Sequence, residues 1–141
     1  MIMDAHGTEA LTMRRLADEL AMGTMALYRY FETKNDLVDA AIEIVAPEIE
    51  LPDAGAGSWK EQLESLARSL FRAGRRHPSL ARERFSRPLQ GPSANRVTDR
   101  AISLLLEAGL SKEEAAAAFK ALLIHSLGAA AIANAEAVSE V

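Results

Sequence analysis

The side chains most able to do chemistry near the start of this 141-residue chain are hydrogen-bond donors. Arg14 and Arg15 are adjacent, and Tyr28 and Arg29 follow shortly after them. An arginine can donate to guanine O6 and N7 together, which is the commonest base-specific contact in DNA recognition. An arginine pair is also ordinary on the solvated face of a helix, so residue type alone leaves both interpretations open. The arrangement of the helices that carry these side chains distinguishes the two interpretations.

A catalytic site is not indicated anywhere in the sequence. The histidines, His6, His77 and His125, are scattered, and there is no glycine-rich phosphate loop, nucleophile motif or pair of metal ligands at helical spacing. With no cysteine there is no disulfide framework and no thiolate metal site. We therefore predict a protein that is not an enzyme and that needs no metal or other cofactor.

Composition predicts helices throughout. Aromatic residues make up only 5% of the chain, and runs of β-branched residues are scarce. The net charge is −4, and residues 1–46 carry four basic against eight acidic side chains, whereas 58–100 carry ten basic against four acidic. Because phosphate neutralisation supplies most non-specific affinity for DNA, non-specific binding by the first segment should be weak and salt-sensitive.

Apolar side chains recur at helical spacing through the first segment and predict three short helices. We expect them over residues 12–20, 24–31 and 33–46, with a turn at Ala21-Met22-Gly23 and a stop at Pro47. Four apolar side chains should join the first two helices, namely Leu16, Leu20, Leu27 and Phe31. This is the spacing of a helix-turn-helix, although any tight helical hairpin shares it.

A second, larger helical unit is expected after a connector at residues 47–57, which is rich in proline and glycine. The unit at 58–141 should contain helices over 58–76, 78–85, 97–108 and 112–135, with a loop over 86–95. Serine and glutamate at capping-box spacing mark two starts, at 58–61 and 111–114, and Gly109 marks an end. The last helix is apolar nearly all round, so we expect it to be buried on more than one face.

The first segment also carries a more specific pattern. The string ALTMRRLADEL over residues 10–20, followed by Met22, ALYRYF over 26–31, Lys34 and Leu37, is similar almost position by position to the helix-turn-helix of the TetR family. Gly7 stands where that family ends its first helix. The resemblance implies an all-α protein: a three-helix DNA-binding domain at 1–46 whose first helix is truncated here, and a helical ligand-binding and dimerisation domain at 58–141.

The resemblance also assigns roles to the donors of the first segment. Arg14 and the start of the second helix would contact bases, with Thr24, Met25, Tyr28 and Arg29 on the face that enters the major groove. Thr12, Tyr30 and Lys34 would contact phosphates and position the domain. Arg14 and Arg29 are the best candidates for sequence specificity.

A weaker resemblance to the tetracycline-repressor branch covers most of the rest, through Ser58-Trp59, Ser86-Arg87-Pro88, residues 107–111 and Ile124–Gly128. It implies a small-molecule pocket, for which we propose Leu66, Leu70, Phe71, Phe85, Leu105, Phe119 and His125. Their helical spacing favours ordinary core for each of these residues, and a satisfied buried histidine for His125, over a ligand contact. Leucines stand near the tetracycline-contacting positions and Glu83 or Arg84 near the metal-binding histidine, so an apolar or aromatic effector is expected rather than tetracycline with magnesium.

Together these features predict a cytoplasmic, homodimeric repressor that an effector releases from double-stranded operator DNA. The chain shows no secretory signal and, by eye, no stretch of 18 apolar residues, so no membrane partner is expected. Both ends look shortened relative to the family. The alternative is a helical ligand-binding or dimerisation module that no longer binds DNA, which the acidic balance of residues 1–46 favours.

Overall fold

Residues 10–86 and 91–139 are described by this computed structural model, and they form helices and the connections between them. No strand occurs in these ranges, so the expected all-α class is confirmed. The helices are α2 (Met13–Glu19), α3 (Thr24–Leu27), α4 (Lys34–Val45), η2 (Ala46–Glu48), α5 (Trp59–Arg76), α6 (Pro78–Ser86), α7 (Pro92–Glu107) and α8 (Lys112–Ser139). Gly7 lies outside the described residues.

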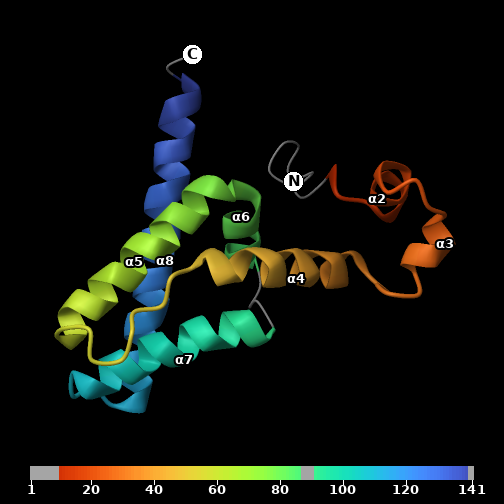
Figure 1. Cartoon of the computed structure of the whole chain (residues 1–141). Helices are drawn as coiled ribbons and strands as arrows, with labels where there is room; N and C mark the ends of the chain where they lie inside the picture. The colour runs from red at the N-terminus through yellow and green to blue at the C-terminus, as the bar shows by residue number, and fades with distance from the viewer. Residues whose placement is uncertain (1–9, 87–90, 140–141) are drawn as a thin grey trace.

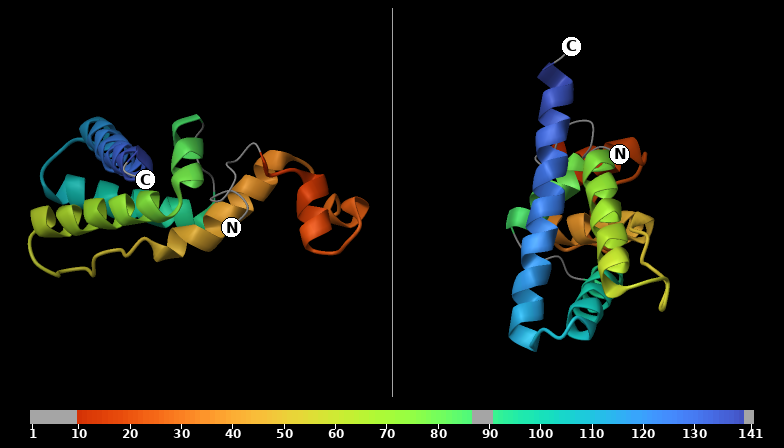
Figure 2. Two further views of the ribbon diagram at one scale, coloured as in Figure 1. Left: turned by 90° about the horizontal axis from the view of Figure 1, so that it is seen from above. Right: turned by 90° about the vertical axis from the view of Figure 1, so that its left-hand side faces the viewer.

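α4 joins two bodies of the molecule (Figure 1). α2 and α3 lie at its N-terminal end, whereas α5, α6, α7 and α8 gather around its C-terminal end (Figure 2). α5 packs along α8, and α7 contacts α4, α5 and α8. Each body has its own hydrophobic core, and α4 contributes Leu37, Val38, Ile42 and Val45 to the first one. One helix is therefore shared between the small body and the larger one.

Capping boxes fix the starts of three helices. At α5, the Ser58 hydroxyl accepts the Glu61 N–H at 3.4 Å and the Glu61 carboxylate accepts the Ser58 N–H at 2.7 Å. The same pair of bonds occurs at residues 111–114, before α8, so both boxes expected from the spacing are confirmed. Thr33 and Asp36 form a third box at the start of α4.

α7 ends in the motif that its sequence predicts. Gly109 has a φ of +93°, a left-handed conformation that glycine adopts without steric cost. The N–H groups of Gly109 and Leu110 donate to the carbonyls of Leu106 and Leu105, at 2.9 and 3.2 Å. Leu110 then packs against the core of the larger body, which completes a Schellman motif.

The start of α7 differs from the expectation. The predicted loop over 86–95 is wrong at both edges, because α6 extends to Ser86 and α7 begins at Pro92; residues 87–90 lie outside the described residues. Gly91 is the N-cap and has no side chain to cap with. The carboxylate of Glu43, on α4, instead accepts the Ser93 N–H, with both oxygens 3.1 Å from the nitrogen. A cap supplied by a distant helix leaves no local signal in the sequence.

The connection between η2 and α5 is bound to the larger body. The Glu50 N–H donates to the buried Ser69 hydroxyl at 2.8 Å. Arg100, on α7, donates to the Pro52 carbonyl at 3.1 Å and to the side-chain oxygen of Gln62. Gln62 is itself buried in α5. The path of residues 49–57 is therefore fixed by side chains of α5 and α7.

Within a single chain, α8 buries one face, and the expected burial of a further face stays a prediction. Its buried side chains are Ala115, Phe119, Leu123, Ser126, Leu127 and Ala130, whereas Ile124 and Ile132 are 48% and 63% exposed. The prediction that no stretch is apolar enough to span a membrane is wrong, because Lys112–Ala137 passes by length and composition. A core helix passes the same test, and α8 packs along α5 and α7.

Candidate functional site

α2 and α3 form the expected helix pair, but α3 is shorter than the predicted range of 24–31. Regular helix ends at Leu27, and residues 28–30 form a turn. The N–H groups of Tyr28 and Phe31 still donate to carbonyls four residues back, at 3.3 and 2.9 Å. The chain therefore keeps turning in the helical sense through most of the segment that carries the donors.

Three of the four side chains expected to join these helices do so. Leu27 is 3% exposed, and Leu16 and Phe31 are partly buried against the same core. Leu20 is 56% exposed, so its predicted packing role is wrong. It is the C-cap of α2, and the chain turns away directly after it, with Ala21 in a left-handed conformation at a φ of +51°.

The residues assigned to DNA contact lie on the accessible side of this helix pair. Met25 and Tyr30 are each 77% exposed and Tyr28 is 48% exposed. The others are exposed or half-buried: Thr12, Arg14, Thr24, Arg29 and Lys34. Accessibility is the condition for contact, and the role of each residue remains a prediction.

The two adjacent arginines differ in their surroundings. Arg15 approaches Glu19 one turn along α2, with 3.9 Å between Nε and the carboxylate oxygen. Arg14 is exposed and makes no ion pair with any residue that the structure describes. The Thr12 hydroxyl accepts the Arg15 N–H at 3.1 Å as the N-cap of α2, which leaves its own O–H free to donate. Of these two neighbours, Arg14 is thus the one whose guanidinium has no ion pair among the described residues.

A cavity of about 380 Å³ lies at the other end of α4. This is within the range of roughly 300–1,000 Å³ that is usual for small-molecule sites. Its wall is built by the last turn of α4, η2 and the four helices of the larger body. The apolar lining residues are Ile42, Val45, Ala46, Ile49, Leu70, Ala73, Gly74, Ala81, Ala94, Val97, Ala116, Phe119, Leu123 and Leu127.

Two of the residues proposed for the pocket, Leu70 and Phe119, line this cavity. Leu66 and Leu105 are buried in the core of the larger body but do not line it. Ile42 and Val45 of α4 also line the cavity, and neither is among the pocket residues proposed from the sequence.

The remaining three proposed residues lie away from the cavity wall. Phe71 is half-buried on α5, and Phe85 is 49% exposed on α6. His125 is exposed, so the prediction that it is a pocket donor or a buried histidine is wrong. Leu123 and Leu127 take the inward face of α8, and a residue midway between them points outward by helical periodicity.

Polar side chains interrupt the apolar wall at four positions. They are His77, Arg84, Thr98 and Lys120, and no aspartate or glutamate lines the cavity among the residues that the structure describes. The Thr98 hydroxyl donates within α7 to the Ala94 carbonyl at 3.1 Å. His77 lies 3.3 Å from the Glu48 carboxylate. The Glu48 pKa is held below its ordinary value mainly by this hydrogen bond to His77 and also by Arg76.

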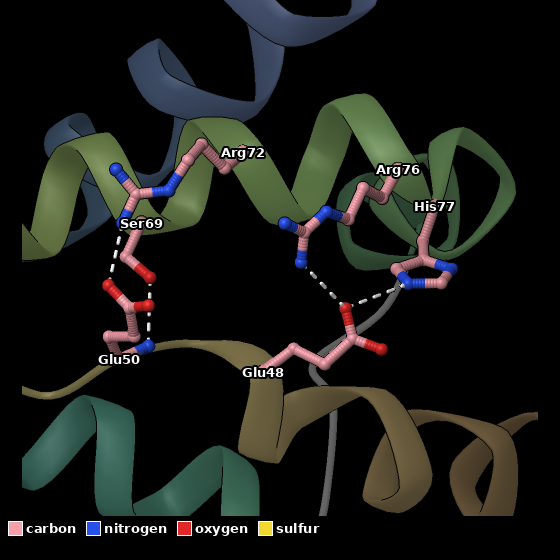
Figure 3. Close-up of polar contacts among 6 residues, drawn as sticks. All are labelled: Glu48, Glu50, Ser69, Arg72, Arg76 and His77. Carbon is pink, nitrogen blue, oxygen red and sulfur yellow. Dashed lines mark hydrogen bonds and ion pairs between the residues drawn. The ribbon is translucent and has the colours of Figure 1, made fainter.

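Two carboxylates, those of Glu48 and Glu50, connect the segment after α4 to α5 (Figure 3). Glu48, at the end of η2, contacts both Arg76 and His77 at 3.3 Å, and Glu50 contacts Arg72 at 2.8 Å. The basic cluster formed by Arg72, Arg76 and His77 is therefore paired with acidic side chains. With the Glu43 cap on α7, these contacts connect the end of α4 to two helices of the cavity wall.

Comparison with known proteins places both halves of the chain. Residues 1–41 match the family model of bacterial regulatory proteins of the tetR family, and residues 51–140 match that of the tetracyclin repressor-like C-terminal domain. The HTH-type transcriptional repressor DrrR1 of Streptomyces coeruleorubidus is 41% identical over 130 residues, which are 92% of this chain and 48% of that protein. The chain thus spans about half the length of this relative.

Solved structures show the same arrangement of helices. Apo ActR from Streptomyces coelicolor superposes with a TM-score of 0.85 at 36% identity, over 95% of this chain and 64% of that one. ActR in complex with actinorhodin gives the same TM-score, over 96% and 65%. BioQ with its double-stranded DNA operator superposes with a TM-score of 0.79 at 27% identity, over 95% and 81%.

Proposed function

Because this chain belongs to the TetR family of bacterial regulatory proteins, as its sequence predicts, we propose that it is a ligand-responsive transcriptional repressor. The observation that carries the proposal is the position of α4. Its first turn joins the helix pair, and its last turn forms part of the cavity wall. A molecule that fills the cavity therefore contacts the same helix that positions the DNA-reading residues.

Operator DNA would be read by the exposed side of α2 and α3. Arg14 and Arg29 would donate to base edges in the major groove, and Thr12, Tyr30 and Lys34 would contact phosphates. The structure of BioQ on its operator, which shares this fold, supports DNA as the partner. The excess of acidic residues in 1–46 implies that affinity depends on specific contacts and on two subunits binding together.

A second copy of the chain would cover the exposed side of α8. Ile124 and Ile132 lie there among alanines, and isolated exposure of so apolar a helix face is unfavourable. Two subunits would then present their helix pairs about one DNA turn apart, roughly 34 Å, to a palindromic operator.

The effector would be a small apolar or aromatic molecule held in the cavity. ActR, which shares the fold, binds actinorhodin, and this supports the cavity as a ligand site. Ligand binding would move α4 and change the separation of the two helix pairs, which releases the DNA. Linkage then requires operator DNA to weaken effector binding by the same factor by which the effector weakens DNA binding. The corresponding coupling free energy is typically about 1–3 kcal/mol.

Relatives of this chain are transcriptional regulators, and we propose that it is likewise a cytoplasmic regulator and not an enzyme. A second candidate is a ligand-binding and dimerisation module without DNA affinity. The eight acidic side chains against four basic ones in residues 1–46 favour it.

Fluorescence anisotropy on labelled duplexes from the promoter next to its own gene, across a salt series, tests these proposals. Arg14→Ala should weaken binding by about 5–150-fold, the equivalent of roughly 1–3 kcal/mol for one bidentate base contact. The matched control is Arg82→Ala, an exposed arginine on α6, which should bind as the original chain does. Equal loss in both variants would remove α2 from the reading surface, and binding by neither form to any duplex would favour the second candidate.

A further inference from the structure

Two cations line the cavity, Arg84 from α6 and Lys120 from α8. Among the residues that the structure describes, no aspartate or glutamate lines the cavity beside them. We propose that the ligand is an amphipathic anion, with an apolar or aromatic body and one carboxylate, phenolate or sulfonate group placed between Arg84 and Lys120. This inference rests on the proposed role of the cavity as the effector site and names the chemical class of that effector.

The body of the ligand follows from the apolar part of the wall. Phe119, Leu123 and Leu127 of α8 line the cavity together with Ile42 and Val45 of α4. A wall of aliphatic side chains with one aromatic ring favours a hydrocarbon or ring system over a sugar, because most hydroxyl groups of a sugar would lack partners there.

The charge of the ligand follows from the donors that remain free. The Thr98 hydroxyl already donates to a carbonyl of its own helix, and His77 is engaged by Glu48. Arg84 and Lys120 make no ion pair or hydrogen bond with any residue in the described part of the chain. They are the donors left to face a bound molecule.

Binding also changes the solvation of these two cations. A ligand that fills the cavity displaces water from Arg84, which is half-buried, and from Lys120 at the rim. A neutral ligand would not replace the hydration that the two cations lose, and a cationic ligand would add electrostatic repulsion. An anion restores a charge-assisted hydrogen bond to each, so the cavity selects by charge as well as by shape.

A matched series of fluorescent probes tests the charge preference: anthracene-2-carboxylate, its neutral amide and its aminomethyl cation. Titrated into the full chain at neutral pH, the carboxylate should bind at least about tenfold more tightly than the amide, with the cation weakest. Arg84→Gln and Lys120→Gln should each weaken the carboxylate about tenfold and leave the amide unchanged.

Controls separate charge from folding. Arg82→Gln on α6 and Lys112→Gln on α8 remove one cation from the same helices, away from the cavity, and should leave all three affinities unchanged. Arg84→Lys keeps the charge and should recover most of the carboxylate affinity lost in Arg84→Gln. Circular dichroism verifies that each variant is helical.

The outcomes distinguish this inference from the function on which it rests. Equal affinity for amide and carboxylate, or a loss of both on Arg84→Gln, would overturn the anion preference and leave the cavity as a ligand site. Binding of none of the three probes would overturn the inference together with the proposed effector site.

Discussion

The contact between Glu43 and the first turn of α7 gives the sharpest prediction for stability. α7 has no N-cap side chain of its own because Gly91 occupies that position, and the Glu43 carboxylate of α4 accepts the Ser93 N–H instead. Glu43→Ala removes the acceptor and the negative charge from this helix N-terminus. Glu43→Gln removes only the charge.

The magnitude can be worked from these contacts. Loss of an N-cap acceptor costs about 0.5–2 kcal/mol, and loss of a charge at a helix N-terminus about 0.3–1 kcal/mol. We expect Glu43→Ala to lower the free energy of unfolding by about 1.5 kcal/mol and Glu43→Gln by about 0.5 kcal/mol. For a chain of this size the corresponding falls in Tm are about 6 and 2 °C.

Thermal unfolding followed by circular dichroism measures the shift, and amide hydrogen exchange locates it. Protection should fall at residues 92–97, the first turns of α7, and remain unchanged in α5. The control is Glu32→Ala, an exposed glutamate before α4 that makes no hydrogen bond among the described residues. If Glu43→Ala shifts Tm no more than Glu32→Ala does, the cap is not a stabilising contact and the coupling of α4 to α7 fails with it.

Three further predictions follow from local geometry. Gly109→Ala should cost about 1 kcal/mol in denaturant unfolding, because a Cβ there meets nothing within 4 Å and only the φ of +93° is unfavourable. Gly74→Val should lower the free energy of unfolding by about 1–3 kcal/mol, because a Cβ at residue 74 would lie 2.9 Å from the Cβ of Ala130 on α8. It should also weaken binding of the anthracene carboxylate, because Gly74 lines the cavity, and an unchanged affinity would contradict that position. Hydrogen bonds from Ser58 hold the Glu61 pKa below its ordinary value. Its contribution to stability is therefore present above the unfolded-state pKa and lost as pH falls through the lower folded-state pKa, so Glu61→Gln should unfold with a shallower acid dependence.

The fold was largely predictable because its signals are local. Periodicity, capping boxes and the glycine after α7 are each set by residues within a few positions of one another, and the structure places α5, α6 and α8 close to the expected ranges. The early start of α7 was missed because its cap comes from Glu43, 50 residues before Ser93. The short α3 and the exposed Leu20 were missed because periodicity marks apolar positions and does not show where the chain turns.

The cavity was less predictable than the helix pair, and the reason lies in α4. The residues predicted to contact DNA lie within one short stretch, residues 12–34, so a motif can identify them. The cavity wall combines side chains from six elements, and only Leu70 and Phe119 of the proposed set belong to it. Ile42 is both a core residue of the small body and a wall residue of the cavity. Since one side chain packs in both places, a ligand that displaces it would, under the proposed function, disturb the core that α4 shares with α2 and α3.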